Sequence, residues 1–214
     1  MRWLIWRELI IIGRTPSFWL AAAVYVSVLT LFVVIWGDGL PIVGAGPVWD
    51  QFSAVQLSVL LVLLPWTATR CVTTRRRRDL RVLAIVTASR PAELILARCI
   101  ALGAALLVLV LTALPIAIVM QQIAAIPFSA IATALLPLLG LSLFVAVAAT
   151  GFMLAFANPL PAWLITSAVT VVASRTVALT PASTPVWIGI ALGAALLLTM
   201  NADSRLAYQA EERT

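Results

Sequence analysis

The chain contains no lysine and no histidine, so all fourteen of its basic residues are arginine. Without lysine it lacks the phosphate-binding lysine of a Walker A loop and cannot form a Schiff base. Without histidine it lacks the imidazole base of hydrolytic triads and a common ligand of zinc sites. We therefore expect that the chain is not an enzyme by itself, and that any ATP-driven work uses an ATPase on another polypeptide.

Charged residues are scarce as well, at 10% of the chain, whereas 63% of the residues are hydrophobic and the mean hydropathy is +1.11. A soluble domain with a hydrated surface is excluded by this composition, which predicts an all-α integral membrane protein. The net charge of +6 comes from arginines that cluster at predicted membrane boundaries without interleaved aromatic residues. We therefore expect membrane lipids with anionic headgroups as partners, and no nucleic acid.

Only two cysteines are present, Cys71 and Cys99. Both fall at the predicted cytoplasmic face, where the reducing environment disfavours a structural disulfide, so we predict two plain thiols. The N-terminal apolar run resembles a signal peptide in having arginines before it. However, it is about 20 residues long and ends at Trp36 without a small-residue cleavage site, which predicts an uncleaved first span.

The sequence predicts a single transmembrane domain, residues 1–214, with an interfacial helix at residues 1–16 that combines arginines, tryptophans and aliphatics. Pro16 ends this helix, and Gly/Pro-rich or polar turns separate the apolar runs that follow. The two longest runs each approach 30 residues, so we expect them to be tilted, to bend at Pro115 and Pro137, or to extend past the bilayer. The six predicted spans are about 17–36, 51–69, 92–120, 128–157, 160–178 and 186–200.

Arginine placement predicts the orientation, because eight of the fourteen lie between Arg70 and Arg98. Loops rich in arginine stay in the cytoplasm, so both chain ends are predicted to be cytoplasmic, in an inner or plasma membrane. Tryptophans collect at membrane interfaces, and the predicted spans put all eight there. The inner boundary would hold Trp3, Trp6, Trp19, Trp66 and Trp163, and the outer boundary Trp36, Trp49 and Trp187.

The basic segment, residues 70–91, contains a short amphipathic helix. At 100° per residue, one narrow face of residues 75–89 carries Arg77, Arg81, Ala84 and Ala88, and the opposite arc is aliphatic. The segment is too short to span, so it is predicted to lie along the cytoplasmic surface, with Pro91 starting the next helix and Glu93 near that helix's positive end. The alternative is a loop whose only role is to orient the chain.

Two stretches resemble the permease subunits of ABC transporters of the ABC-2 (type V exporter) group. The first runs from Arg7 to Trp19, with basic residues and a proline before the first span. The second runs from Arg78 to Pro91, a leucine-rich helix and a proline break, and is followed by the basic residue Arg98 in the next span. Six spans with both ends in the cytoplasm also match, so the resemblance covers nearly the whole chain.

The resemblance implies that residues 80–88 form a coupling helix, which docks on a separate nucleotide-binding ATPase subunit. That subunit would bind ATP and Mg, and its movements would drive the spans between inward-open and outward-open states. A second permease subunit, identical or different, is also implied. The implied ATPase-coupling residues are Arg77, Leu80, Arg81, Leu83, Ala84 and Ala88.

A substrate path is predicted from intramembrane polar residues. Thr166, Thr170 and Ser174 recur on one face of the fifth span, Arg175 ends that stripe, and Gln56 lies in the second span. A mostly apolar path would suit a hydrophobic or amphipathic substrate.

Each of these residues also has a structural explanation that involves no role in transport. Hydroxyls in membrane helices commonly bond to their own helix or pack against a neighbour. A snorkelling side chain accounts for Arg175 near the outer surface, and for Arg98 and Glu93 near the cytoplasmic end of the third span. The amide of Gln56 still requires a partner in hydrocarbon.

Two other functions are compatible with the composition. A non-transporting membrane scaffold or accessory subunit would not bind an ATPase through residues 80–88. A membrane-embedded enzyme acting on lipid headgroups would need converging carboxylates or histidines, and only Asp79 and Glu93 are available near the basic segment.

Overall fold

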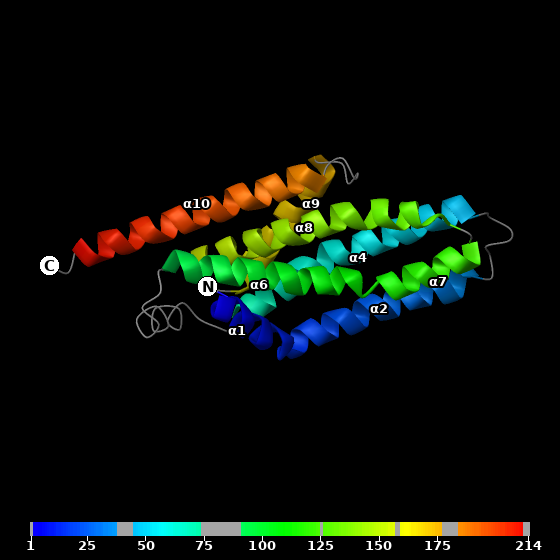
Figure 1. Ribbon diagram of the computed structural model, residues 1–214, viewed down its shortest axis with the longest axis horizontal. Coiled ribbons are helices and arrows are strands. Elements are labelled where there is room, and N and C mark those ends of the chain that lie inside the picture. The colour runs from blue at the N-terminus through cyan, green and yellow to red at the C-terminus, as the bar shows by residue number, and fades with distance from the viewer. Residues whose placement is uncertain are drawn as a thin grey trace.

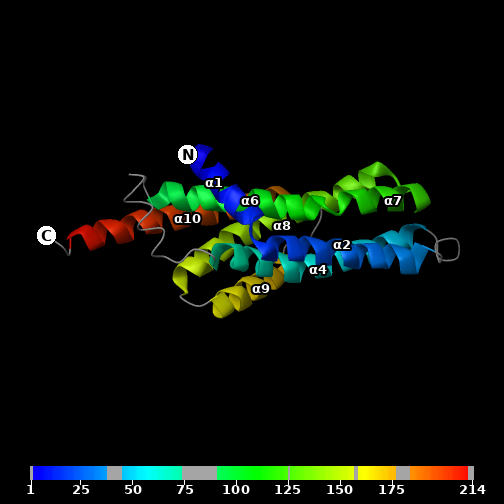
Figure 2. The same cartoon turned by 90° about the horizontal axis from the view of Figure 1, so that it is seen from below.

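The computed structural model describes residues 2–37, 45–73, 91–124, 126–156, 159–176 and 184–211, and the regular structure in these residues is α-helical. Apart from α1, which crosses the others obliquely, the helices run roughly along one common axis (Figures 1 and 2), which agrees with the predicted all-α class. Their bounds are α1 Arg2–Gly13, α2 Pro16–Gly37, α4 Ala45–Thr73, α6 Pro91–Leu111, α7 Leu114–Ala124, α8 Phe128–Ala155, α9 Pro159–Thr176 and α10 Thr184–Glu211.

Four stretches are long and apolar enough to cross a membrane: Pro16–Ile35, Val48–Val72, Ala92–Gln122 and Phe128–Ala155. They correspond to the first four predicted spans. Helix α9, with 18 residues, is not among these stretches, and the described apolar part of α10 runs from Thr184 to Leu198 within a helix of 28 residues. Four of the described helices thus agree with the predicted membrane protein, and the fifth and sixth spans stay predictions.

Proline and threonine mark the irregularities inside these helices. The third span divides at Thr112 and Ala113, just before Pro115, where the Thr112 hydroxyl donates to the carbonyl of Leu109 at 2.6 Å. Pro115 has no N–H to donate and its ring crowds the preceding turn, so the break predicted at this residue has a direct physical cause. Pro137, in contrast, lies within the continuous helix α8.

Helix α8 is the centre of the bundle and contacts α4, α6, α9 and α10. Glycines permit the closest of these contacts: a Cβ at Gly103 would lie 2.9 Å from the side chain of Leu143, and one at Gly140 would lie 2.9 Å from the Cβ of Trp187. Small residues at such points let membrane helices approach closely, and the attraction is then mainly van der Waals packing.

Trp187 lies in this central packing and is fully buried, with its ring 5.4 Å from that of Phe144. Because α10 begins beside the middle of α8, Trp187 packs against protein, and its predicted place at the outer boundary stays a prediction. Trp3, Trp6 and Trp19 do have exposed side chains, as an interfacial position requires.

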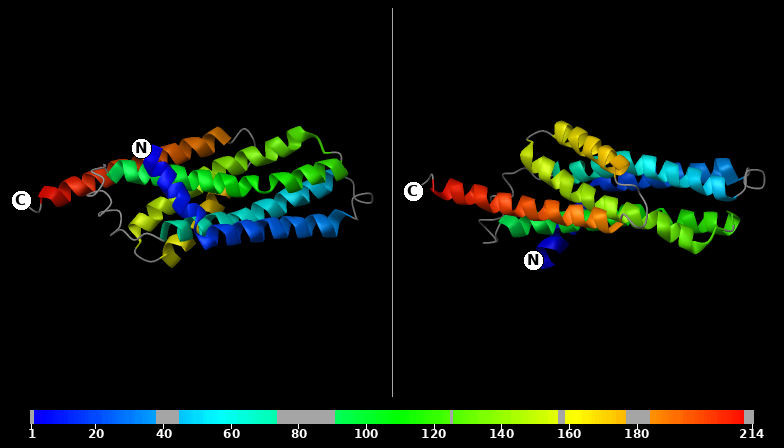
Figure 3. Two further views of the ribbon diagram at one scale, coloured as in Figure 1. Left: turned by 60° about the horizontal axis from the view of Figure 1, so that its bottom comes forward. Right: turned by 90° about the horizontal axis from the view of Figure 1, so that it is seen from above.

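One end of the bundle gathers most of the described charge. Helix α1, the end of α4, the start of α6 and the far end of α10 all lie there (Figures 1 and 3). We call it the arginine-rich end, defined by Arg2, Arg7, Arg14, Arg70 and Arg98.

Candidate functional site

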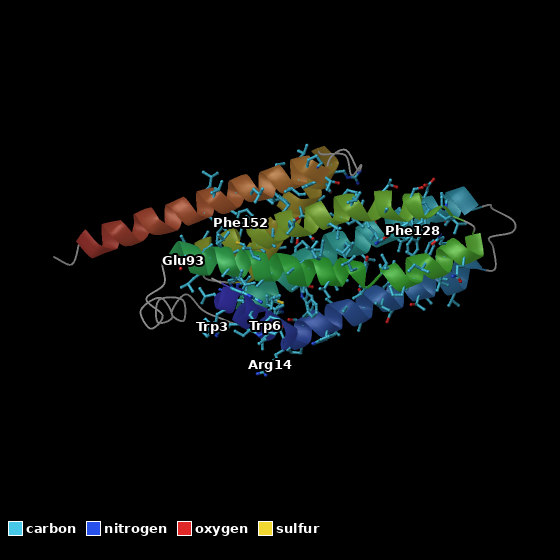
Figure 4. The ribbon with its side chains drawn as sticks, viewed as in Figure 1. Trp3, Trp6, Arg14, Glu93, Phe128 and Phe152 are labelled. Atoms are coloured by element: carbon cyan, nitrogen blue, oxygen red, sulfur yellow. The ribbon has the colours of Figure 1, made fainter. Side chains whose placement is uncertain are left out.

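The amino-terminal helix is attached to the arginine-rich end by one face. Leu4 of α1 packs with Leu94 and Ala97 of α6 in a small buried cluster. The opposite face carries Trp3 and Trp6, which are 62% and 64% exposed and point away from the bundle in Figure 4. Helix α1 is therefore amphipathic in the structure, with tryptophan on the face that does not contact protein.

The corner between α1 and α2 is held by side-chain bonds to the main chain. The indole N–H of Trp19 donates to the carbonyl of Gly13 at 2.7 Å, and the Thr15 hydroxyl donates to the carbonyl of Ile12 at 2.6 Å. The guanidinium of Arg7 lies 5.7 Å from the Trp3 ring centre, within cation–π range. These bonds satisfy the last carbonyls of α1 and fix the angle at which the first span begins.

Arg98 makes the central contact of the site. Its side chain is 5% exposed, and its Nη2 donates to the carbonyl of Val72 at 2.8 Å. Val72 is one residue from the end of α4, so this carbonyl belongs to the last turn, whose carbonyls lack partners within the helix. A cation is favourable at that negative helix end.

The snorkelling interpretation of Arg98 was therefore wrong. A snorkelling arginine extends toward water, whereas this one is buried and bonded between two helices. The carbonyl end of α4 supplies the hydrogen-bond acceptor that water would otherwise provide. Glu93, five residues earlier, is exposed in the first turn of α6, near its positive end as predicted.

Four helices meet at the level of Arg98 through a polar layer, which we define as Thr15, Cys71, Arg98, Cys99 and Thr150. The Thr15 hydroxyl lies 3.5 Å from the Cys71 sulfur, and Cys99 lies beside Thr150, whose hydroxyl donates to the carbonyl of Ala146 at 2.8 Å. Both cysteines are buried and free, which confirms the prediction of two plain thiols. The layer joins the start of α2, the end of α4, the first half of α6 and the last part of α8.

The predicted coupling residues lie outside the described residues, namely Arg77, Leu80, Arg81, Leu83, Ala84 and Ala88. The structure does place their two flanks, Thr73 and Pro91, at the arginine-rich end. The polar layer connects α4 to α6 within a few residues of these flanks. The two points between which the basic segment is attached are therefore fixed relative to each other.

The predicted substrate-path residues are distributed over two separate contacts. Gln56 is 2% exposed, and its Nε2 donates to the Tyr25 hydroxyl at 3.0 Å, which joins α4 to α2. Thr166 and Thr170 belong to α9, where each hydroxyl donates to a carbonyl of its own helix at 2.6 Å. The described contacts do not bring Gln56 and the α9 residues together.

The packing alternative accounts for these bonds, and the role in a substrate path stays a prediction. Ser174 donates to the carbonyl of Val171 at 2.8 Å, which again is a bond within its own helix. Arg175 is exposed in the last turn of α9. The intramembrane amide of Gln56 has found its partner in Tyr25, and not in a polar channel.

Sequence reasoning missed Tyr25 and three buried polar atoms. Tyr25 is fully buried, and the signal for it was a single phenol within the apolar run of the first span. The Thr67 hydroxyl, the Trp163 indole nitrogen and the Ser167 hydroxyl are buried without hydrogen-bond partners, on the contacting helices α4 and α9. A small polar residue is common in a membrane helix, so the sequence gave no reason to single out the last three.

Comparisons with known proteins give no family for this chain. Searches against family models, curated proteins and solved structures found no match.

Proposed function

We propose that this chain is the membrane-spanning permease subunit of an ATP-driven exporter. It would move a hydrophobic or amphipathic substrate by alternating access, powered by a separate nucleotide-binding subunit that holds ATP and Mg. The permease would work with a second permease subunit, identical or different, in an inner or plasma membrane. Both chain ends and the basic segment would face the cytoplasm.

One observation supports this proposal most directly, the arrangement of the arginine-rich end. Both flanks of the basic segment, helix α1 and the carboxyl-terminal end of α10 lie together at one end of the bundle. A docking ATPase can therefore contact all of these elements on one face. Three of the five arginines that define this end belong to α1 or α4, and Arg14 directly follows α1, so this face is basic.

The polar layer gives this face a mechanical connection to the membrane helices. Arg98 bonds to the end of α4, Thr15 contacts Cys71, and Cys99 lies beside Thr150. A displacement of the basic segment would thus act on α4 and α6 together and, through them, on α2 and α8. Alternating access requires this kind of coupling between a docking face and several packed helices.

A pair of charge reversals tests the proposal. We would purify the tagged chain in mild detergent and identify co-purifying proteins by mass spectrometry, then measure ATPase activity and transport. We expect a stoichiometric subunit with a Walker A motif, and we expect Arg77→Glu with Arg81→Glu to release or uncouple it. The matched comparison is Arg2→Glu with Arg14→Glu, which changes the net charge equally at exposed positions of the arginine-rich end but outside the predicted coupling helix.

Two results would contradict the proposal. Finding no ATPase under several gentle extraction conditions would favour a non-transporting scaffold. Equal loss of the ATPase in the two double variants would mean that general positive charge, and not the predicted coupling helix, holds the partner.

A further inference from the structure

Helices α8 and α10 pack side by side and run in the same direction. A Cβ at Gly140 would lie 2.9 Å from Trp187, and a Cβ at Gly151 would lie 3.1 Å from Leu198. The two contacts are separated by the same number of residues on both helices. One fixed register therefore places the first turn of α10 beside Gly140, well inside α8.

The polar layer gives a plane from which depth can be measured. It contains Thr150 and the residue just before α2, so it marks where the first span begins. At 1.5 Å per residue, Gly140 lies about 15 Å along α8 from Thr150, and Phe128 lies about 33 Å from it. The first residue of α10, Thr184, is then about 20 Å from the plane. Helix α8 continues roughly 13 Å beyond the point where α10 starts.

Helix α9 reaches a similar depth from the other side of α8. It begins four residues after the last residue of α8, and α8 ends about 8 Å beyond Thr150 on the side of the arginine-rich end. Its 18 residues cover about 27 Å, which brings its last turn to about 19 Å from the plane. Figure 3 agrees, since α9 ends and α10 starts part way along the bundle.

The two helices differ in how they relate to this depth. Helix α9 is not among the four stretches that are long and apolar enough to cross a membrane, and Leu198 of α10 lies level with Gly151 near the polar layer. The rest of α10 extends beyond the bundle at the arginine-rich end (Figure 1). Trp187, near the start of α10, is buried against α8.

We propose that α9 and α10 form a re-entrant pair, which enters the membrane from the arginine-rich end and returns to the same end without crossing. The chain then crosses the membrane four times, and both of its ends still lie on one side. Helix ends inside a membrane are tolerated where they pack against protein, and here α8 contacts both helices. Arg175, in the last turn of α9, is favoured by the carbonyl end of its own helix.

This topology does not depend on the proposed ATPase partner or transport substrate, and cysteine labelling tests it directly. In a Cys71→Ala, Cys99→Ala background, single cysteines replace Arg175 and Val186, which are both exposed. Controls are Asp50→Cys near the far end and Arg14→Cys at the arginine-rich end. Each variant is placed in sealed vesicles and treated with a membrane-impermeant maleimide from either side.

From the side opposite Arg14→Cys, we expect rapid labelling of Asp50→Cys and at least tenfold slower labelling of Arg175→Cys and Val186→Cys. Labelling of both test positions within threefold of Asp50→Cys would overturn the proposal, because full crossings would bring them to that surface. If either variant fails to insert, Val172→Cys or Ile188→Cys replaces it.

A nitroxide at the same positions gives a second measurement. The collision rate of the nitroxide with dissolved oxygen, compared with its collision rate with a water-soluble nickel complex, reports the depth of the label in the membrane. We expect Arg175→Cys and Val186→Cys labels to lie deeper than the label at Asp50→Cys. A shallower position on the far side would again contradict the re-entrant pair.

Discussion

The contact between Arg98 and the end of α4 predicts a large local effect for a single substitution. Arg98→Met keeps a long side chain but removes the guanidinium that donates to the Val72 carbonyl at 2.8 Å. A hydrogen bond to a charged group contributes about 1.5–3 kcal/mol. Because the charge is removed together with its bond, no buried cation is left unpaired, and we expect a loss of about 2 kcal/mol.

The thiol of Cys71 reports on this contact, since it belongs to the same polar layer and is only 4% exposed. In a Cys99→Ala background, the rate of Cys71 modification measures how often the layer opens. A loss of about 2 kcal/mol corresponds to roughly 30-fold faster modification when opening is a rapid equilibrium. Arg98→Lys, which keeps a charge and a donor, should restore part of the protection.

Arg70→Met is the matched control, because Arg70 lies on the same end of α4 with an exposed side chain. We expect its Cys71 rate to stay within threefold of the parent. If Arg98→Met behaves like Arg70→Met, the buried guanidinium does not hold α4 to α6, and the mechanical argument for the arginine-rich end fails.

Three further predictions concern packing and the proposed path. Gly140→Ala should destabilise the folded protein by about 1–3 kcal/mol through its clash with Trp187. Gly189→Ala, which has open space around it, should not. If denaturation in mixed micelles showed equal stability for the two variants, the α8–α10 register would be contradicted. Tyr25→Phe should cost about 1–2 kcal/mol in the same assay, because it removes the partner of a buried amide, and an unchanged midpoint would show that Gln56 finds another. Thr170→Leu with Gln56→Leu should alter substrate range or rate if these residues line a path, and unaltered transport in reconstituted vesicles would assign them to packing.

Composition determined the class of this protein before any contact was known. A chain with so few charges and such long apolar runs has no way to cover a water-facing surface, and only helices satisfy their own backbone groups in lipid. The helix boundaries at Pro16, Pro91 and Pro159 could also be predicted from the sequence, because proline suits the first turn of a helix and lacks a hydrogen-bond donor for its interior. Four spans and their ends follow from these local properties.

Tertiary structure decided what the side chains and the last two helices do. Hydropathy measures how apolar a segment is but carries no information on its depth, so the sequence could not give the register of α10 against α8, which the Gly140–Trp187 contact sets. The same limit applies to Arg98: its sequence neighbours suggested a boundary residue, whereas its acceptor is supplied by α4, a different helix. A polar group in hydrocarbon is governed by the partner it meets, and that partner is set by how the helices pack.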